Sequence, residues 1–96
     1  MEALAIVEVL GRRGEVIHRE RLNRLPVVVG RGFDADLILD DPHVAASHLR
    51  IEAAGEKDFR LVDLGTKNGF NILGKSAPRT RRTEALVSAG ATVRLG

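Results

Sequence analysis

Residues 69–76 read GFNILGKS, which matches the phosphate-binding pattern G-x-x-x-x-G-K-[ST] at every fixed position. In a nucleotide hydrolase this loop works because it joins a strand to a helix whose N-terminal N–H groups point at the anion. Here Lys75 and Ser76 are followed by APRTRR, which contains a proline and no apolar helical stripe. No helix dipole would face a nucleotide, so we interpret the match as a coincidence and FNIL as a buried strand.

Two other polar groupings resemble catalytic or metal sites. Ser47 and His48 are neighbours, so in an extended strand their side chains point to opposite faces and cannot form a proton relay. Four aspartates crowd one region without the glycine and terminal glutamate of a calcium loop, and we interpret them as turn formers and caps: Asp34, Asp36, Asp40 and Asp41. With no Cys and three scattered His, we expect no metal site.

The composition limits the class of protein. A chain of 96 residues with 44% hydrophobic and 29% charged residues is enough for one small globular domain, and too short for a nucleotide hydrolase with its full parallel sheet. No apolar run approaches the roughly 20 residues of a membrane span, and no basic region precedes the short apolar stretch at the N-terminus. Since Cys is also absent, we expect a cytoplasmic protein.

The elements that must position the loops are short strands divided by Gly, Pro, Asn and Asp, with hardly any helical period. This pattern predicts an all-β sandwich. The first two runs flank Gly-Arg-Arg-Gly and predict a hairpin. The expected strands are AIVEVL (5–10), EVIHRERL (15–22), PVVVG (26–30), ADLIL (35–39), HLRIEAA (48–54), FRLVDL (59–64), FNIL (70–73), EALV (84–87) and ATVRLG (91–96).

Three loops carry an ordered set of residues whose spacing resembles the forkhead-associated (FHA) domain. The resemblance spans almost the whole chain, and it implies a mixed, mainly antiparallel β-sandwich of about ten to eleven strands that binds phosphothreonine peptides at one end, with no catalysis and no cofactor. The residues that carry it are Gly30-Arg31, Asp36-Leu37-Ile38-Leu39, Asp41-Pro42, His48, Asp63-Leu64-Gly65-Thr66, Asn68-Gly69 and a final VRLG.

The resemblance assigns expected roles to individual residues. Arg31 matches the phosphate-binding Arg, whose planar fork suits a dianionic group, although a surface ion pair with Asp40 or Asp41 is the alternative. Asn68 matches the residue that hydrogen-bonds the peptide main chain, although it also fits a simple Asn-Gly turn.

Further residues complete the expected site. We include Thr66 and Lys67 among the phosphopeptide-binding residues, and Lys67 could supply charge to the phosphate. His43 matches a position that often selects the peptide residue three places after the phosphothreonine, although an exposed loop His is the simpler interpretation. Gly30, His48 and Gly69 are expected to shape the pocket, with His48 bracing a loop rather than touching phosphate.

The chain departs from the family pattern at two pocket positions. Ala45 replaces a Ser whose hydroxyl donates to the phosphate, and Ala46 replaces a residue that is often Arg or Asn. Because a hydrogen bond to a charged group is worth ~1.5 to 3 kcal/mol, losing the Ser should weaken binding roughly tenfold to a hundredfold unless another donor replaces it.

Three functions follow from these residues. The first is phosphothreonine-dependent recognition of a partner protein in signalling, with a partly degraded pocket, and a bacterial source is compatible with the Ala- and Arg-rich composition. The second is an assembly or regulatory module that has lost phosphate dependence. The third is nucleic-acid binding through clustered arginines, which the composition disfavours because the chain lacks Tyr and Trp and has only three Phe for stacking on bases.

The last strand of the family, which pairs beside the first, is missing from this sequence or belongs to residues beyond Gly96. We therefore expect a single FHA-like domain over residues 1–96 that is a piece of a larger protein. An unpaired first strand, AIVEVL, would be an apolar sheet edge that recruits other strands. This edge predicts a possible homodimer.

Overall fold

The computed structural model describes residues 4–73 and 82–95, which form nine strands and no helix. Each of the nine predicted runs is found as a strand, so the all-β class is confirmed, and no described segment is a helix able to cross a membrane. The resemblance implied ten to eleven strands for the whole chain, and nine of them lie within residues 4–73 and 82–95. The strands are β1 (Ala5–Leu10), β2 (Val16–Leu22), β3 (Val27–Gly30), β4 (Leu37–Ile38), β5 (Leu49–Ala53), β6 (Asp58–Asp63), β7 (Phe70–Leu73), β8 (Glu84–Ser88) and β9 (Thr92–Leu95).

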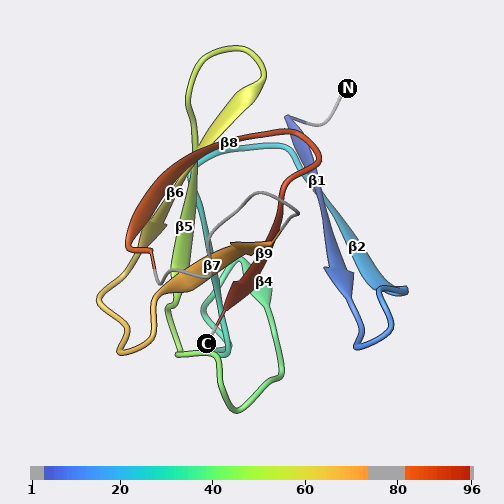
Figure 1. Cartoon of the computed structure of the whole chain (residues 1–96), viewed down its shortest axis with the longest axis vertical. Coiled ribbons are helices and arrows are strands. Elements are labelled where there is room, and N and C mark those ends of the chain that lie inside the picture. Colours follow the sequence, from blue (N-terminus) through green and yellow to red (C-terminus); the bar gives the residue numbers. More distant parts are fainter. Residues whose placement is uncertain (1–3, 74–81, 96) are drawn as a thin grey trace.

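The strands form a sandwich around one core. Five of them make a sheet in the order β4-β3-β5-β6-β8, in which β3 and β4 are parallel and the other neighbours antiparallel. The antiparallel pairs β1–β2 and β7–β9 contribute to the same core, since Leu22 and Phe70 join one buried cluster with Val29, Leu49 and Leu61 of the larger sheet. The predicted β-sandwich is confirmed (Figure 1).

The period-2 pattern of the sequence explains which face each strand buries. In β5, Leu49 and Ile51 are buried while Arg50 and Glu52 alternate with them on the outer face. That outer face carries a row of ion pairs, Arg50–Glu52 at 2.6 Å and Arg60 to Glu84 of β8 at 3.1 Å. Arg50 neutralises a carboxylate of its own strand, and Arg60 neutralises one across strands, as opposite charges on a solvated sheet face commonly do.

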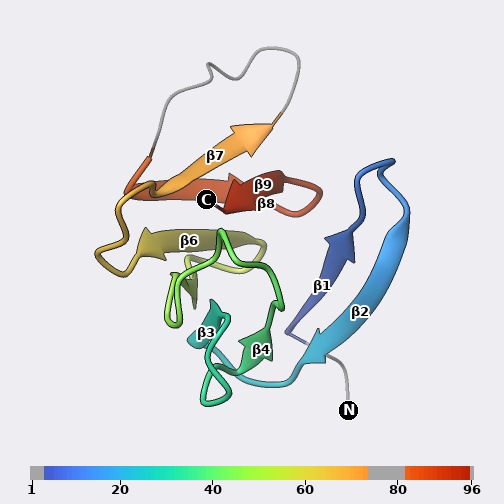
Figure 2. The same cartoon turned by 90° about the horizontal axis from the view of Figure 1, so that it is seen from below.

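Neither edge of the β1–β2 hairpin has a strand partner among residues 4–73 and 82–95, and the first strand is therefore open on one side. Figures 1 and 2 both show β1 on the inner side of the hairpin, with its open edge toward the β7–β9 pair. A strand added to β1 would therefore have to lie between the hairpin and β9. The edge exists as predicted, whereas the homodimer stays a prediction.

Candidate functional site

Three loops gather at the end of the sandwich that is lowest in Figure 1: residues 31–36, 39–48 and 64–69. Backbone hydrogen bonds join them directly. The Arg31 N–H donates to the Ala45 carbonyl at 2.9 Å, the Gly32 N–H to the Ala46 carbonyl at 3.0 Å, and the Leu64 N–H to the His48 carbonyl at 2.9 Å. The loops are thus fixed relative to one another, so side chains from all three share one surface.

Gly30 permits the close approach of the first two loops. A Cβ atom at this position would lie 2.1 Å from the Ala46 carbonyl oxygen and 3.0 Å from that of Ala45, so any side chain is excluded. The predicted pocket-shaping role of Gly30 has a clear steric basis, because the backbone hydrogen bonds of Arg31 and Gly32 depend on this contact.

Arg31 is exposed, and its guanidinium forms no ion pair or hydrogen bond with any residue that the structure describes. The alternative ion pair with Asp40 or Asp41 is therefore not formed. Asp41 instead accepts from the His43 N–H at 2.8 Å and lies 3.2 Å from His43 Nδ1. The His43 N–H is the main reason why the pKa of the Asp41 carboxyl is lowered.

His48 connects two of the loops from inside the protein. Its side chain is 2% exposed, its Nδ1 accepts from the Ala45 N–H at 3.0 Å, and its Nε2 lies 2.8 Å from the Gly69 carbonyl. Since Nδ1 must accept and Gly69 O cannot donate, the ring carries its proton on Nε2. This geometry matches the predicted bracing role, and the buried ring cannot reach a ligand.

Thr66 also faces inward. Its hydroxyl donates to Asp63 Oδ1 at 2.5 Å and accepts from the Gly69 N–H at 2.9 Å, while Asp63 Oδ2 accepts from the Thr66 N–H at 2.9 Å. The hydroxyl proton is thus already donated to a carboxylate that is 3% exposed. The sequence grouped Thr66 with the phosphopeptide-binding residues. In the structure its hydrogen bonds stabilise the turn that carries Lys67 and Asn68.

We expect Thr66→Val, which is nearly isosteric, to lower the free energy of unfolding by about 1–3 kcal/mol, because the buried Gly69 N–H and Asp63 carboxylate each lose a partner. Thr66→Ser keeps the hydroxyl and is the matched control. Urea unfolding of both variants measures the difference. Equal stability of Thr66→Val and the natural protein would contradict this account of the turn.

Lys67 and Asn68 lie exposed at the tip of the third loop. The Asn68 side chain forms no hydrogen bond with another described residue, so its amide donor and acceptor face solvent. Gly69 follows with a φ of +64°, a backbone conformation that glycine adopts at low energetic cost because it has no Cβ atom, and this allows the chain to turn sharply. Arg31, Lys67 and Asn68 are therefore all exposed on these loops, and His43 is exposed on the second loop.

Residues 27–96 match the family model described as the FHA domain. The chain belongs to the FHA domain family. The FHA domain-containing protein FhaB of Mycolicibacterium smegmatis is 34% identical over 79 residues, covering 81% of this chain and 47% of FhaB, so the chain spans about half the length of this curated relative.

Two solved FHA domains extend the comparison. The FHA domain of CT664 from Chlamydia trachomatis is similar to this chain with a TM-score of 0.78 and 26% sequence identity. The match covers 95% of this chain and 87% of the CT664 chain. A second, from a structural and functional analysis of phosphothreonine-dependent FHA domain interactions, has a TM-score of 0.66 and 32% identity, covering 82% of this chain and 76% of its own.

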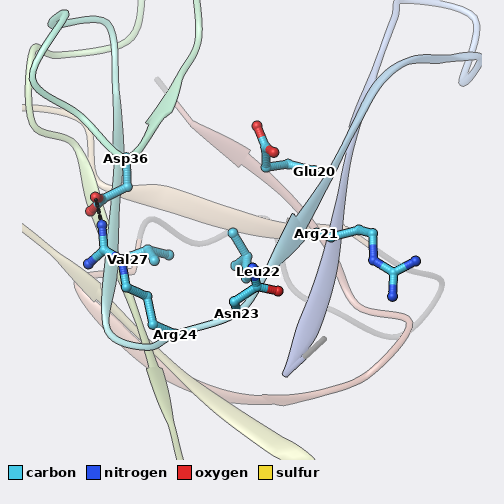
Figure 3. Close-up of a pocket in the computed structure, with 7 residues that line it drawn as sticks. All are labelled: Glu20, Arg21, Leu22, Asn23, Arg24, Val27 and Asp36. Carbon is cyan, nitrogen blue, oxygen red and sulfur yellow. Dashed lines mark hydrogen bonds and ion pairs between the residues drawn. The ribbon is translucent and has the colours of Figure 1, made fainter. Parts of the chain in front are cut away.

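Asp36, which the sequence placed among turn formers and caps and in the set of residues that resembles the family, has a specific structural role in this FHA domain. Its carboxylate accepts from the Val28 N–H at 2.8 Å and from Arg24 at 2.7 Å, as Figure 3 shows for the Arg24 contact. The Val28 N–H is the main cause of the lowered pKa of Asp36.

A hollow of about 330 Å³ adjoins Asp36. It is lined by Glu20, Arg21, Leu22, Asn23, Arg24, Val27 and Asp36. Arg24 and Asp36 pair with each other there, and residues of β2 and of the larger sheet line the hollow, so we interpret it as the junction between hairpin and sandwich.

Proposed function

We propose that this FHA domain binds phosphothreonine peptides through Arg31, Lys67 and Asn68, and that it serves as an interaction module rather than an enzyme. The observation that carries the proposal is the exposed Arg31 guanidinium, which has no partner among the described residues although Asp41 lies on the adjoining loop. An unpaired Arg on loops held by backbone hydrogen bonds suits a dianionic group, because little reorganisation is needed on binding.

Each proposed role follows from the chemistry of its side chain. Arg31 would hold two phosphate oxygens, and Lys67 would add a positive charge without the same geometric fork. Asn68 would pair with one peptide backbone unit through its amide oxygen and nitrogen. Thr66 would act by positioning these two side chains, and His43 would contact the peptide farther from the phosphate.

Ala45 limits the affinity of the proposed site. The Ala45 N–H and carbonyl are both engaged, with His48 and Arg31, so they add nothing to a phosphate. We expect Ala45→Ser to tighten phosphopeptide binding by about tenfold, since one hydroxyl donor to a charged acceptor is worth ~1.5 kcal/mol or more. Isothermal titration calorimetry measures the change. A Ser variant that binds no better than the natural protein would argue against a phosphate beside residue 45.

The second candidate is an FHA module without phosphate dependence, favoured by the loss of side-chain donors at Ala45 and Ala46. Fluorescence anisotropy with a degenerate phosphothreonine peptide library and its unphosphorylated copy separates the two. The first proposal requires discrimination between the libraries, whereas the second requires equal binding or none. Nucleic-acid binding would instead appear as affinity for any DNA that falls steeply with salt.

We propose as partner a phosphorylated, cytoplasmic protein, for instance the substrate of a Ser/Thr kinase. The open edge of β1 supports two further proposals: in a longer chain a strand from residues beyond Gly96 fills it, and in residues 1–96 alone a second copy of this chain pairs there.

Sedimentation of residues 1–96 and of a longer natural chain tests them together. We expect the short chain to dimerise at high concentration and the longer chain to remain monomeric. A short chain that stays monomeric at millimolar concentration would contradict pairing through β1.

A further inference from the structure

The turn of the β1–β2 hairpin, here called the hairpin tip (residues 10–17), carries aliphatic side chains in solvent. Leu10, Val16 and Ile17 are 40%, 47% and 64% exposed, and they flank the turn on both sides. Of the nine large apolar side chains that are exposed in the described part of the chain, five lie within residues 4–17. Scattered exposed apolar residues are common, whereas a cluster of them indicates an interaction surface.

A β-bulge gathers the three aliphatic side chains of the tip. Leu10 pairs with Val16, and the preceding pair is Val9 with His18, so Ile17 is an extra residue in β2. Two residues of β2 therefore oppose a single residue of β1 at this point. The bulge places Val16 and Ile17 together beside Leu10.

These side chains lie on the outer face of the hairpin. Val7 packs against the core, so alternation along β1 places Leu10 on the opposite face. Figure 3 shows Arg21 pointing away from Leu22, and alternation along β2 places Ile17 on the side of Arg21. The tip thus presents its aliphatic side chains away from the sandwich.

The charges of the tip and the outer face are mainly positive. The guanidinium groups of Arg12 and Arg13 form no ion pair with any residue within the described ranges. Glu15 accepts from the Arg13 N–H at 2.9 Å. After the His43 N–H, the charge of Arg12 also contributes to the lowered pKa of Asp41 on the neighbouring loop.

Four arginines and two glutamates make up the charged groups of the tip and the outer face: Arg12, Arg13, Arg19, Arg21, Glu8 and Glu15. Glu8 is already paired with Arg19 at 2.6 Å. The surface therefore complements a negatively charged occupant.

We propose that the hairpin tip binds the surface of an anionic lipid bilayer. Leu10, Val16 and Ile17 would enter the boundary between headgroups and acyl chains, while Arg12 and Arg13 would lie at the lipid phosphates. Burial of aliphatic side chains and attraction of cationic side chains to anionic lipids strengthen each other at such a boundary. The inference does not depend on phosphopeptide binding.

The shape of the tip favours a bilayer over a folded protein as the occupant. Figures 1 and 2 both show the turn at the free end of the hairpin, with no strand beyond it. A projecting tip needs a closely matching pocket in a protein partner, because the cores of protein interfaces are packed as densely as protein interiors. A fluid lipid surface adapts to such a tip without a preformed pocket.

The test is co-sedimentation of residues 1–96 with vesicles made of equal parts phosphatidylglycerol and phosphatidylcholine, and with vesicles of phosphatidylcholine alone. We expect the anionic vesicles to bind at least about tenfold more tightly, and this difference to shrink as salt is added. Ile17→Ser keeps the charge and should lower the affinity about tenfold. Leu86→Ser on β8, where the side chain is also 64% exposed, is the matched control and should stay within about twofold.

A second pair of variants tests the contribution of charge. Arg13→Gln should lower the affinity for anionic vesicles about fivefold, because each arginine near such a surface contributes roughly 1 kcal/mol. Arg94→Gln, which removes an exposed arginine from β9, should stay within about twofold. Equal losses in both variants would show adsorption through overall charge and overturn the proposal.

Three further outcomes would also overturn it: no binding to anionic vesicles, equal binding to both kinds of vesicle, or equal losses in Ile17→Ser and Leu86→Ser. Sedimentation without vesicles tests a second copy of the chain as the occupant. The dimer expected through the β1 edge should persist in Ile17→Ser. If Ile17→Ser instead abolishes a dimer and the vesicles bind no protein, the tip is a contact between copies and not a bilayer site.

Discussion

Arg31→Ala is expected to lower the affinity for a phosphothreonine peptide by at least a hundredfold and to remove discrimination against the unphosphorylated copy. The guanidinium has no described partner to lose, so the change acts on binding and not on the fold. Two charge-assisted hydrogen bonds at ~1.5 to 3 kcal/mol each exceed the roughly 2.7 kcal/mol that corresponds to a hundredfold change. Calorimetric titration with both peptides measures the loss, and thermal melting checks that the fold persists.

Two variants control for simple electrostatics. Arg31→Lys keeps the charge but lacks the planar fork, so we expect an affinity between those of the natural protein and Arg31→Ala. Arg21→Ala removes an exposed arginine from β2 and should leave the affinity within about twofold, since exposed charges away from a site contribute little. A similar loss in Arg21→Ala and Arg31→Ala would show that overall charge, and not a defined phosphate site, governs binding.

His48→Ala should be the most damaging of the stability changes considered, lowering the free energy of unfolding by about 3 kcal/mol or more. The substitution leaves the Ala45 N–H and the Gly69 carbonyl without partners and opens a cavity where a buried ring was. For a domain of this size such a loss corresponds to a fall in Tm of about 12 °C or more. Calorimetric melting and urea unfolding measure it.

Two further variants serve as controls for His48→Ala. Ser47→Ala changes the adjacent exposed side chain and should leave Tm within about 2 °C. His48→Gln offers an amide oxygen toward Ala45 and an amide N–H toward Gly69, so it should recover part of the stability. If His48→Ala melts as the natural protein does, the imidazole does not hold the two loops together.

The strands were predictable because most combine β-branched or alternating apolar residues with Gly, Pro, Asn or Asp at their ends. AIVEVL became β1 without change, and the loop residues 64–69 fell between two clear strand patterns. The order of strands in the sheets was harder to predict from the sequence, because β6 and β8 pair although they lie far apart in the chain. The inward position of the open β1 edge likewise depends on packing rather than on local pattern.

Residue type and spacing singled out Arg31 and Asn68 for the candidate site, but they did not predict the surroundings of these residues. Whether Arg31 pairs with Asp41 depends on the turn in which the His43 N–H occupies that carboxylate. The inward hydroxyl of Thr66 follows from the buried Asp63 and was not visible in spacing alone.

The most direct test of a phosphothreonine site on these three loops is a titration followed by ¹H–¹⁵N NMR spectra, using matched phosphorylated and unphosphorylated peptides. The account predicts that the phosphorylated peptide shifts the amides of Arg31, Ala45, Lys67 and Asn68, and that its twin shifts none of them at the same concentration. Identical shifts with both peptides, or shifts confined to β1 and β2, would contradict it.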